Sequence, residues 1–243
     1  MKLHLVMPMA GGGTRFENGC FDMPKPLIVL HGHPFFYWAT ESVAKNIKLE
    51  GITFVVLQEH IEKYEIGKRI LDYYPDAQIV TVPNVLKGAV LTCKEGISSI
   101  KDDIPILFND CDHLFRSELF RSFCQNDAND RIDAGLLTFK SNKPCYSYVL
   151  YDDCKNVIGT IEKEVVSDDA ICGAYYFRDK ETFIQAFQEY MNNCNYSEYY
   201  VSGLYNIMAK NNKKIGVFNT DIHIPFGTPE EFQDAQNMSF SEF

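Results

Sequence analysis

No apolar run in the 243-residue sequence approaches the roughly 18–20 residues that a membrane-spanning helix needs. Positive charge is also scarce, since 23 lysines and arginines stand against 33 aspartates and glutamates, a formal net charge of −10 at pH 7. Proteins that bind duplex nucleic acid or an acidic membrane surface need a basic face, so both partners are disfavoured. The apolar stretch following Met1 is too short for a signal peptide, and a cytoplasmic protein is expected.

Closely spaced cysteine pairs are missing as well. Eight cysteines are spread along the chain, and no two of them are separated by two to four residues. Structural zinc sites use closely spaced ligand pairs, and secreted disulfide scaffolds are usually much smaller than this chain. The cysteines are therefore predicted to be reduced and mostly buried thiols.

Apolar side chains are plentiful, because 46% of the residues are hydrophobic and 14% are aromatic. The chain has no internal repeat, low-complexity tract or obvious linker, which favours a single domain over residues 1–243, with halves at about 1–125 and about 126–243. In the first half, strands are predicted at 3–9, 53–57, 78–82 and 105–109, and helices at 34–48, 59–74 and 88–100. Such repeated β–α–β units predict a Rossmann-like, mostly parallel α/β sheet with helices on both faces.

The second half follows a different pattern. Strands predicted at 133–139, 147–151, 157–162 and 170–177 are separated by short turns, which indicates an antiparallel extension of the sheet. Helices at 180–193 and 197–211, a strand at 215–218 and a helix at 228–237 complete the prediction. The last helix begins with Thr228-Pro229-Glu230-Glu231, which places a hydroxyl at the N-cap, proline at the first position and glutamate at the third.

Unusual chemistry follows two of the predicted parallel strands, at the sheet edge where such folds bind ligands. The first strand runs into Gly11-Gly12-Gly13, whose backbone amides are free to cradle phosphate oxygens. This loop is neither a P-loop, since no Gly-Lys-Ser/Thr follows, nor a dinucleotide fingerprint, since Phe16 replaces the last glycine. Three glycines alone are equally compatible with an ordinary strand-to-loop turn. The second of the two strands, at 105–109, runs into Asp110-Cys111-Asp112.

Two cations near the glycine loop favour phosphate binding. Arg15 lies two residues after the glycines, and Lys25 is flanked by Pro24 and Pro26. The prolines stiffen the backbone and are predicted to hold Lys25 outside a regular element. A cation on a stiff backbone suits the neutralisation of a phosphate at one fixed place.

The combination resembles the sugar-1-phosphate nucleotidyltransferases. Residues 9–16, Met-Ala-Gly-Gly-Gly-Thr-Arg-Phe, and residues 23–27, Met-Pro-Lys-Pro-Leu, carry the resemblance. Further matches lie at 86–89, 106–112, 161–163, 173–177 and 226–231. The resemblance implies a GT-A-like nucleotidyltransferase fold. It also implies Mg²⁺-dependent transfer of a nucleoside monophosphate from a nucleoside triphosphate to a phosphorylated sugar or similar small phosphate, with release of pyrophosphate.

The resemblance also implies a role for each matching residue. Arg15 would hold the β- and γ-phosphates, Lys25 the α-phosphate and Lys163 the acceptor phosphate. The implied nucleotide contacts are Ala10, Gly11, Gly12, Gly13, Thr14, Gly88, Ala89 and Asp110. The implied acceptor contacts are Glu162, Gly173, Tyr175 and Glu198. Asp112 would hold Mg²⁺, and because Pro225 stands where many relatives have a second aspartate ligand, Asp221 is the expected substitute.

Several alternatives remain open. The acceptor could be a non-sugar phospho-compound of a cytidylyltransferase, or Asp110-Cys111-Asp112 could be the metal motif of a GT-A-type glycosyltransferase, or the chain could be a non-catalytic nucleotide sensor. A zinc cluster at residues 110–113 is disfavoured, because adjacent side chains on an extended strand point to opposite faces. His31-Gly32-His33 is interpreted as a turn. The sequence indicates neither the base, the acceptor nor the oligomeric state.

Overall fold

The computed structural model describes residues 1–13, 16, 21–101, 103–126 and 132–240. The strands are β1 (Leu3–Pro8), β2 (Val29–Leu30), β3 (His33–Pro34), β4 (Leu49–Leu57), β5 (Gln78–Val82), β6 (Ile106–Asn109), β7 (His113–Arg116), β8 (Ala134–Lys140), β9 (Ser147–Tyr151), β10 (Val157–Glu162), β11 (Asp169–Phe177), β12 (Ile215–Asn219) and β13 (Ile222–Pro225). The helices are the 3-10 helix η2 (Lys25–Leu27), α1 (Phe35–Ala44), α2 (Gln58–Tyr64), α3 (Ile66–Tyr73), α4 (Ala89–Gly96), α5 (Glu118–Gln125), α6 (Lys180–Asn193), α7 (Gly203–Lys210) and α8 (Pro229–Gln236).

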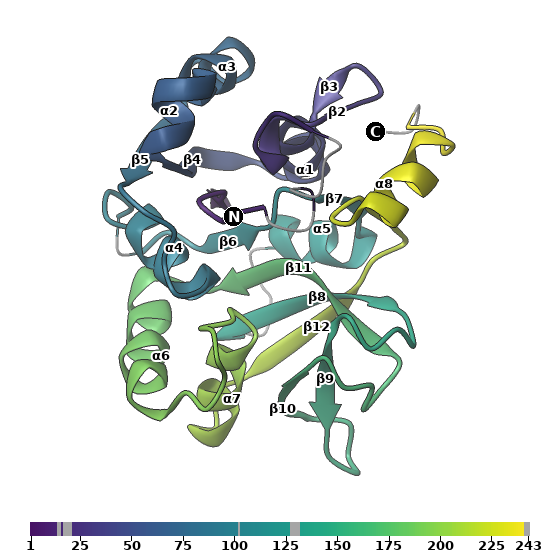
Figure 1. Ribbon diagram of the computed structural model, residues 1–243. Coiled ribbons are helices and arrows are strands. Elements are labelled where there is room, and N and C mark those ends of the chain that lie inside the picture. Colours follow the sequence, from purple (N-terminus) through teal and green to yellow (C-terminus); the bar gives the residue numbers. More distant parts are fainter. Residues whose placement is uncertain (14–15, 17–20, 102, 127–131, 241–243) are drawn as a thin grey trace.

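A nine-stranded sheet runs through the described part of the chain (Figure 1). Its path is β10-β9-β11-β6-β1-β4-β5, with β8 paired to β11 and β12 paired to β8. The four strands β6, β1, β4 and β5 run parallel to one another. On the other side of β6, β11 is antiparallel to it. The predicted α/β class, with a mostly parallel centre and an antiparallel extension, is confirmed.

The strand order places a switch point between β1 and β6. After β1 the chain adds β4 and then β5 on one side, and it crosses back to add β6 on the other side. Connections that leave in opposite directions open a crevice at the carboxyl ends of the two central strands, where ligands bind in such sheets. The glycine loop follows β1 and the acidic segment follows β6, so the fold brings both to that crevice.

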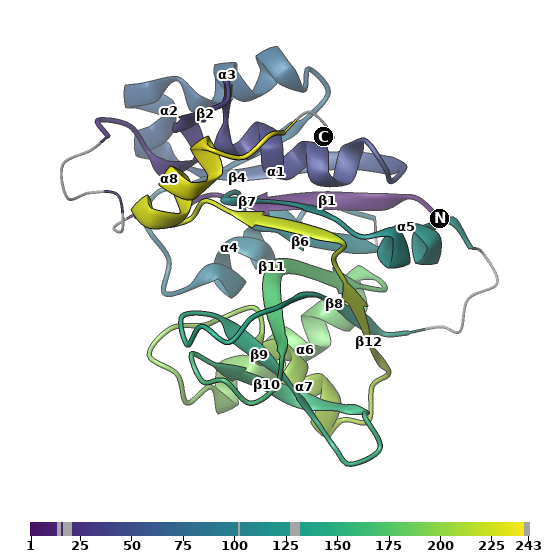
Figure 2. The same cartoon turned by 90° about the vertical axis from the view of Figure 1, so that its right-hand side faces the viewer.

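Helices cover both faces of the parallel strands, as predicted (Figure 2). Along β1, Leu5 and Met7 point toward the cluster that contains α1 and α3, whereas Val6 points toward the cluster that contains α4. Residues that alternate along a strand face opposite sides, and all three are fully buried. This explains why β1 is a continuous apolar run rather than an alternating pattern.

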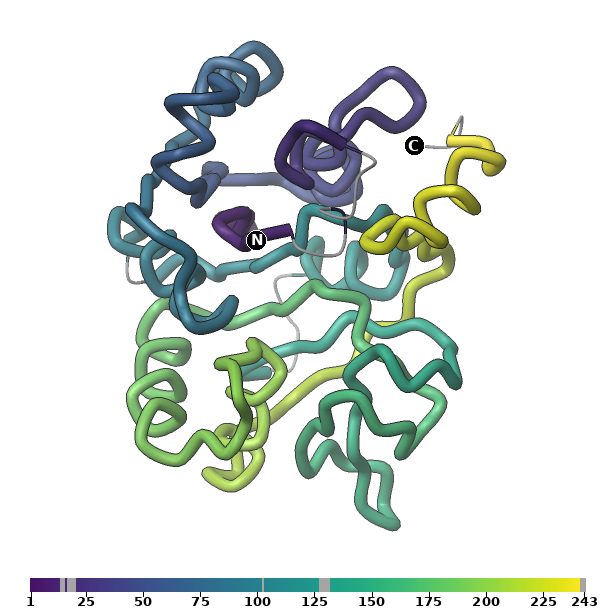
Figure 3. Tube along the Cα trace, viewed as in Figure 1, coloured from purple at the N-terminus to yellow at the C-terminus, as the bar shows by residue number. Residues whose placement is uncertain are grey.

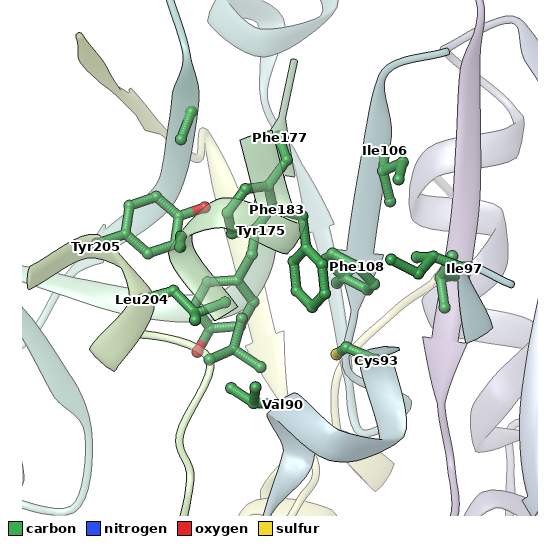
Figure 4. Close-up of a cluster of buried hydrophobic side chains, with 14 of the residues drawn as sticks. Val90, Cys93, Ile97, Ile106, Phe108, Tyr175, Phe177, Phe183, Leu204 and Tyr205 are labelled. Atoms are coloured by element: carbon green, nitrogen blue, oxygen red, sulfur yellow. The ribbon is translucent and has the colours of Figure 1, made fainter. Parts of the chain in front are cut away.

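The second half of the chain shares one apolar core with the sheet. Figure 4 shows Phe108 of β6, Phe177 of β11 and Phe183 of α6 in contact with the residues of α4 and α7. The rings of Phe108 and Phe183 lie 4.9 Å apart in a tilted arrangement, and both residues are fully buried. Replacing a core phenylalanine of this kind by alanine costs about 3–5 kcal/mol.

Several short elements were not predicted, because a few residues carry little periodicity. The most consequential are β7 and β13, which form an antiparallel ribbon with His113 opposite Pro225 and Ile222 opposite Arg116. The ribbon leads residues after 225 back to the acidic segment, where the amide of Phe226 donates to the carbonyl of Asp112 at 2.9 Å. Figure 3 shows α8, in yellow, beside the β2–β3 hairpin, and His31 Nε2 contacts the Ala235 carbonyl at 3.0 Å.

Two predicted helices differ from the structure. The helix at 59–74 is interrupted at Glu65, whose left-handed backbone (φ 52°) separates α2 from α3. The helix at 197–211 begins only at Gly203, because the backbone of Tyr199 is paired elsewhere. Its amide donates to the Lys87 carbonyl at 3.0 Å, and its carbonyl accepts from the Val90 amide at 3.1 Å.

The seven described cysteines are all unpaired, which agrees with the prediction of reduced thiols, and Cys93, Cys111, Cys124 and Cys172 are buried. Among the described residues, no helix combines the length and apolar composition needed to span a bilayer.

Candidate active site

Two adjoining cavities open at the carboxyl ends of β1 and β6, and Asp110 and Asp112 line both of them. The smaller has a volume of about 320 Å³ and is also lined by Pro8, Met9, Gly11, Gly13, Lys25, Pro26 and Cys111. The larger, of about 660 Å³, extends over β9, β10 and β11 toward the segment before α7. The two cavities therefore adjoin at these two aspartates.

Lys25 forms an ion pair with Asp112, with 2.6 Å between Nζ and Oδ2. Contrary to the prediction, Lys25 lies in a regular element, the single-turn 3-10 helix η2, which a proline tolerates because first-turn amides need no partner. Burial opposes the charge of Lys25, but the Asp112 carboxylate more than offsets this and raises the pKa of Lys25. The ammonium is therefore charged at neutral pH and faces the smaller cavity.

The glycine loop forms part of the same wall. Gly11 and Gly13 line the smaller cavity, whereas Ala10 and Gly12 line neither of the two cavities. Thr14 and Arg15 lie outside the described residues, so their predicted roles remain predictions.

The larger cavity brings together the residues that were predicted to bind the acceptor: Glu162, Lys163, Gly173, Tyr175 and Glu198. The carboxylate of Glu162 accepts from Ser147 Oγ at 2.6 Å and also from Ser202 Oγ, which fixes its orientation. Lys163 Nζ lies 3.3 Å from the Tyr200 hydroxyl and 5.5 Å from the centre of that ring. The cavity thus combines a fixed carboxylate with an exposed ammonium.

Gly88 is the N-cap residue of α4, and Ala89 lines the larger cavity, whereas Gly88 does not. The φ of Gly88 is 126°, and a Cβ at this position would collide with the backbone of Tyr199. The two hydrogen bonds between Tyr199 and the 87–90 turn prevent that backbone from moving away. Only glycine fits here, and the segment that carries Glu198 and Tyr200 is held against α4.

Replacing Gly88 by alanine is expected to lower the free energy of unfolding by about 1–3 kcal/mol, because it adds backbone strain and a backbone collision. Urea unfolding followed by circular dichroism measures this loss. Gly11→Ala is the matched control, since a Cβ at Gly11 meets no atom of the described residues within 4 Å, and we expect its stability to stay within about 0.5 kcal/mol of wild type. Equal stability of both variants would contradict the assignment.

The structure does not bring Asp221 to Asp112. The Asp221 amide pairs with Arg116 at one end of the β7–β13 ribbon, whereas Asp112 pairs with Phe226 at the other. Four residues of strand separate the two ends by about 13 Å, which is too far for ligands of one ion. Instead, Asp221 Oδ2 accepts from the Glu118 amide at 2.7 Å and caps the start of α5. Asp221 is therefore corrected from a metal ligand to a helix-capping residue.

Sequence reasoning missed a group of cavity residues, among them His113, Cys172 and His223. Burial lowers the pKa of His113 to about 4. The Asp112 carboxylate opposes this shift, and the Lys25 ammonium adds to it. Burial, with the neighbouring His113, lowers the pKa of His223 well below its usual value, although Asp112 and the Cys172 backbone oppose this shift. Burial also raises the pKa of the Cys172 thiol to about 12. No spacing signal could have found this group, because its members lie on three strands.

Comparison with solved structures shows similar folds. A nucleoside-diphosphate-sugar pyrophosphorylase from Vibrio cholerae RC9 superposes with a TM-score of 0.81 at 22% identity, over 96% of this chain and 100% of the other. The inositol-1-phosphate CTP transferase from T. maritima superposes with a TM-score of 0.76 at 15% identity, over 98% and 97% of the two chains. Both likenesses extend over nearly the full length of each chain.

Sequence comparison gives a match of similarly low identity. The chain is 21% identical over 236 residues to the bifunctional protein GlmU of Clostridium perfringens strain SM101, and the match covers 91% of this chain and 48% of the relative. The chain thus spans about half the length of the relatives that it matches. No family model matches the chain. The resemblance that the motifs indicated is nevertheless confirmed, and the chain has the fold of the sugar-1-phosphate nucleotidyltransferases.

Proposed function

We propose that the protein transfers a nucleoside monophosphate from a nucleoside triphosphate to a phosphorylated sugar or similar small phosphate, and releases pyrophosphate. The observation that carries this proposal is the pair of cavities that share Asp110 and Asp112. The smaller presents the glycine loop and Lys25, and the larger presents Lys163 and Glu162. The predicted halves, residues 1–125 and 126–243, would then bind the triphosphate and the acceptor respectively.

Charge explains why such a reaction needs this site. An anionic acceptor oxygen must approach the α-phosphorus of an anionic triphosphate, so the two reactants repel each other. At 4 Å and an effective dielectric constant near 20, one opposite charge contributes about 4 kcal/mol before desolvation is counted. Lys25 on the triphosphate side and Lys163 on the acceptor side would each supply such a contact in a chain of net charge −10. No covalent intermediate is needed, because positioning and charge neutralisation suffice.

The donor set between the cavities fits Mg²⁺. Asp110 and Asp112 supply hard carboxylate oxygens, the ligands that Mg²⁺ takes together with substrate phosphates. The backbone at Gly227 lies directly against the Asp112 carboxylate, where a Cβ would collide with Oδ2, so the carboxylate is held in place. When bound, Mg²⁺ would neutralise phosphate charge and orient the phosphate oxygens. Asp112 and Asp110 would hold it, and Lys25 would then be available to the phosphates.

Replacing Lys163 by methionine is expected to raise the KM for the acceptor phosphate by about 10–100-fold, which corresponds to the 1.5–3 kcal/mol of a charge-assisted hydrogen bond. The KM for the triphosphate should change little, because Lys163 lines only the larger of the two cavities. Steady-state kinetics of pyrophosphate release, with each substrate varied in turn, separate the two constants.

Lys155 offers a matched control for this variant. Both lysines have a left-handed backbone, with φ of 65° at Lys155 and 57° at Lys163. The ammonium of Lys155 also lies over a tyrosine ring, 5.9 Å from the centre of Tyr151, but Lys155 lines neither cavity. Lys155→Met should keep both KM values. If the two variants behaved alike, the assignment of Lys163 to the acceptor phosphate would be wrong.

The proposal is tested by a pyrophosphate-release screen. Each common nucleoside triphosphate is combined with sugar 1-phosphates, inositol 1-phosphate and phosphorylated alcohols, with Mg²⁺ present. We expect pyrophosphate only when one preferred triphosphate and one acceptor are both supplied. Hydrolysis of a nucleotide sugar without pyrophosphate formation would instead indicate the glycosyltransferase alternative, and nucleotide binding without turnover would indicate a sensor.

A phosphorylated alcohol that is not an aldose is the second candidate acceptor. It is favoured by the likeness to a solved inositol-1-phosphate CTP transferase and by the aromatic side chains of the larger cavity, including Tyr146, Tyr175 and Tyr200. The same screen decides between the two acceptor classes. A cytoplasmic location remains part of the proposal, since it is where triphosphates and phosphorylated metabolites are available.

A further inference from the structure

Three side chains to which the proposed transfer gives no role converge at the wall of the larger cavity. His113 lies on β7, His223 on β13 and Cys172 on β11, and one potential ligand atom of each lies within 4.8 Å of the other two. The ribbon explains the histidines. Pro225 pairs with His113, and residue 223 is two positions away, so both imidazoles emerge on the same face with ring centres 5.5 Å apart.

The irregular part of β11 adds the thiol. The pairing of β11 with β8 shifts register between Ile171 and Tyr175, which is where a strand re-aims its side chains. Cys172 lies in this segment and lines the same cavity as the two histidines. The group is therefore assembled from three strands that are distant in sequence.

The His113 imidazole lacks hydrogen-bond partners. His113 is 2% exposed, and neither of its ring nitrogens has a hydrogen-bond partner among the described residues. Buried polar atoms in folded proteins are nearly always paired. Two unpaired nitrogens on a buried ring, next to a second imidazole and a thiol, are the arrangement expected when a ligand supplies the missing bonds.

The donor types identify the class of ligand. Imidazole nitrogen and thiolate sulfur suit Zn²⁺ and related first-row ions, whereas Mg²⁺ takes oxygen ligands. We propose that His113, Cys172 and His223 bind a zinc-like transition-metal dication. A tetrahedral ion needs donors about 3.3–3.6 Å apart. Because the three donor atoms already lie within 4.8 Å of one another, they need to approach by no more than about 1 Å on binding. The Cys172 proton would leave to solvent as the sulfur–metal bond forms.

Three protein ligands leave a fourth position open, as in catalytic rather than structural zinc sites. All three residues line the larger cavity, so the fourth ligand would be a water molecule or an oxygen of the acceptor. The use of this position by the acceptor rests on the proposed function, whereas metal binding itself does not.

Metal binding is tested on the complete chain without substrate. The chain is stripped with a chelator and titrated with Co²⁺, a spectroscopic substitute for Zn²⁺, in excess Mg²⁺ to occupy the carboxylates. We expect one Co²⁺ per chain with a thiolate-to-cobalt charge-transfer band in the near ultraviolet and intense tetrahedral d–d bands, both removed by Zn²⁺. Absence of the charge-transfer band in the wild-type chain would overturn the proposal.

Variants assign the ligands. Loss of second-sphere partners weakens metal binding by about 10–100-fold, so Cys172→Ser and His223→Gln, which each remove a ligand, should weaken it by more than about 100-fold. Cys172→Ser should also abolish the charge-transfer band. Cys145→Ser is the control, because this exposed thiol lines the same cavity, and it should keep the band. A band retained in Cys172→Ser, or lost in Cys145→Ser, would contradict the assignment.

The fourth coordination position of the bound ion is tested by a separate measurement. Adding inorganic phosphate to the Co²⁺ form should shift the d–d bands as an oxygen ligand enters, and unchanged bands would refute an open fourth position. Failure of the proposed function would appear separately, as a chain that binds Co²⁺ but releases no pyrophosphate in the substrate screen.

Discussion

Lys25→Ala is expected to lower kcat for pyrophosphate release by about 10²–10³-fold, the effect seen when one preorganised charge-stabilising donor is removed. The ammonium lines the smaller cavity, in which the triphosphate would bind under the proposed function. Its loss removes the positive charge that lies 2.6 Å from the Asp112 carboxylate, so negative charge increases where the triphosphate would bind in the proposed reaction. Steady-state kinetics at saturating substrates measure the change.

Lys140→Ala is the control for this variant. Lys140 also forms a lysine–aspartate ion pair, at 2.9 Å from Asp169, but its side chain is 67% exposed and lies outside both cavities. Exposed pairs contribute about 0–1 kcal/mol to stability, so neither turnover nor folding should change measurably. Wild-type turnover in Lys25→Ala, with the fold verified by circular dichroism, would remove Lys25 from the mechanism.

Asp112→Asn is expected to reduce turnover by more than about 100-fold, since loss of even an outer-sphere partner costs 10–100-fold in metal sites. The substitution keeps the size of the side chain but removes the charge that would hold Mg²⁺ and that pairs with Lys25. Turnover measured over a range of Mg²⁺ concentrations should show a much weaker apparent affinity for the ion. Turnover independent of Mg²⁺ in both wild type and variant would exclude the metal role.

Asp221→Asn tests the competing assignment. Because Asp221 caps α5 at the far end of the ribbon, its amide substitute should leave the Mg²⁺ dependence unchanged and cost about 0.5–1 kcal/mol of stability. A large loss of Mg²⁺ affinity in this variant would restore Asp221 as a metal ligand and contradict the geometry described above.

Local patterns predicted most of the sheet and of its helices. The apolar run of β1 and the β-branched run of β4 identified central strands, and Thr228-Pro229-Glu230-Glu231 identified the start of α8, where the capping box is formed. The strands β7 and β13 were not predicted, because four residues carry little periodicity and, unlike β6, they do not belong to a repeated β–α–β pattern. The helical spacing of tyrosines predicted a helix that included residues 197–202. That part of the prediction is wrong because the backbone of Tyr199 pairs with the 87–90 turn, about a hundred residues away, which no local pattern reveals.

Within the candidate site, the sequence by itself determined which segments would line the smaller cavity: the glycine loop, the proline-flanked Lys25 and the aspartates after β6. It could do so because these residues lie in short contiguous motifs. Only the tertiary structure decided that Asp112 pairs with Lys25, that Asp221 lies at the wrong end of a ribbon, and that His113, Cys172 and His223 meet. Those outcomes depend on strand register and on contacts between distant segments, and neither leaves a mark on local spacing.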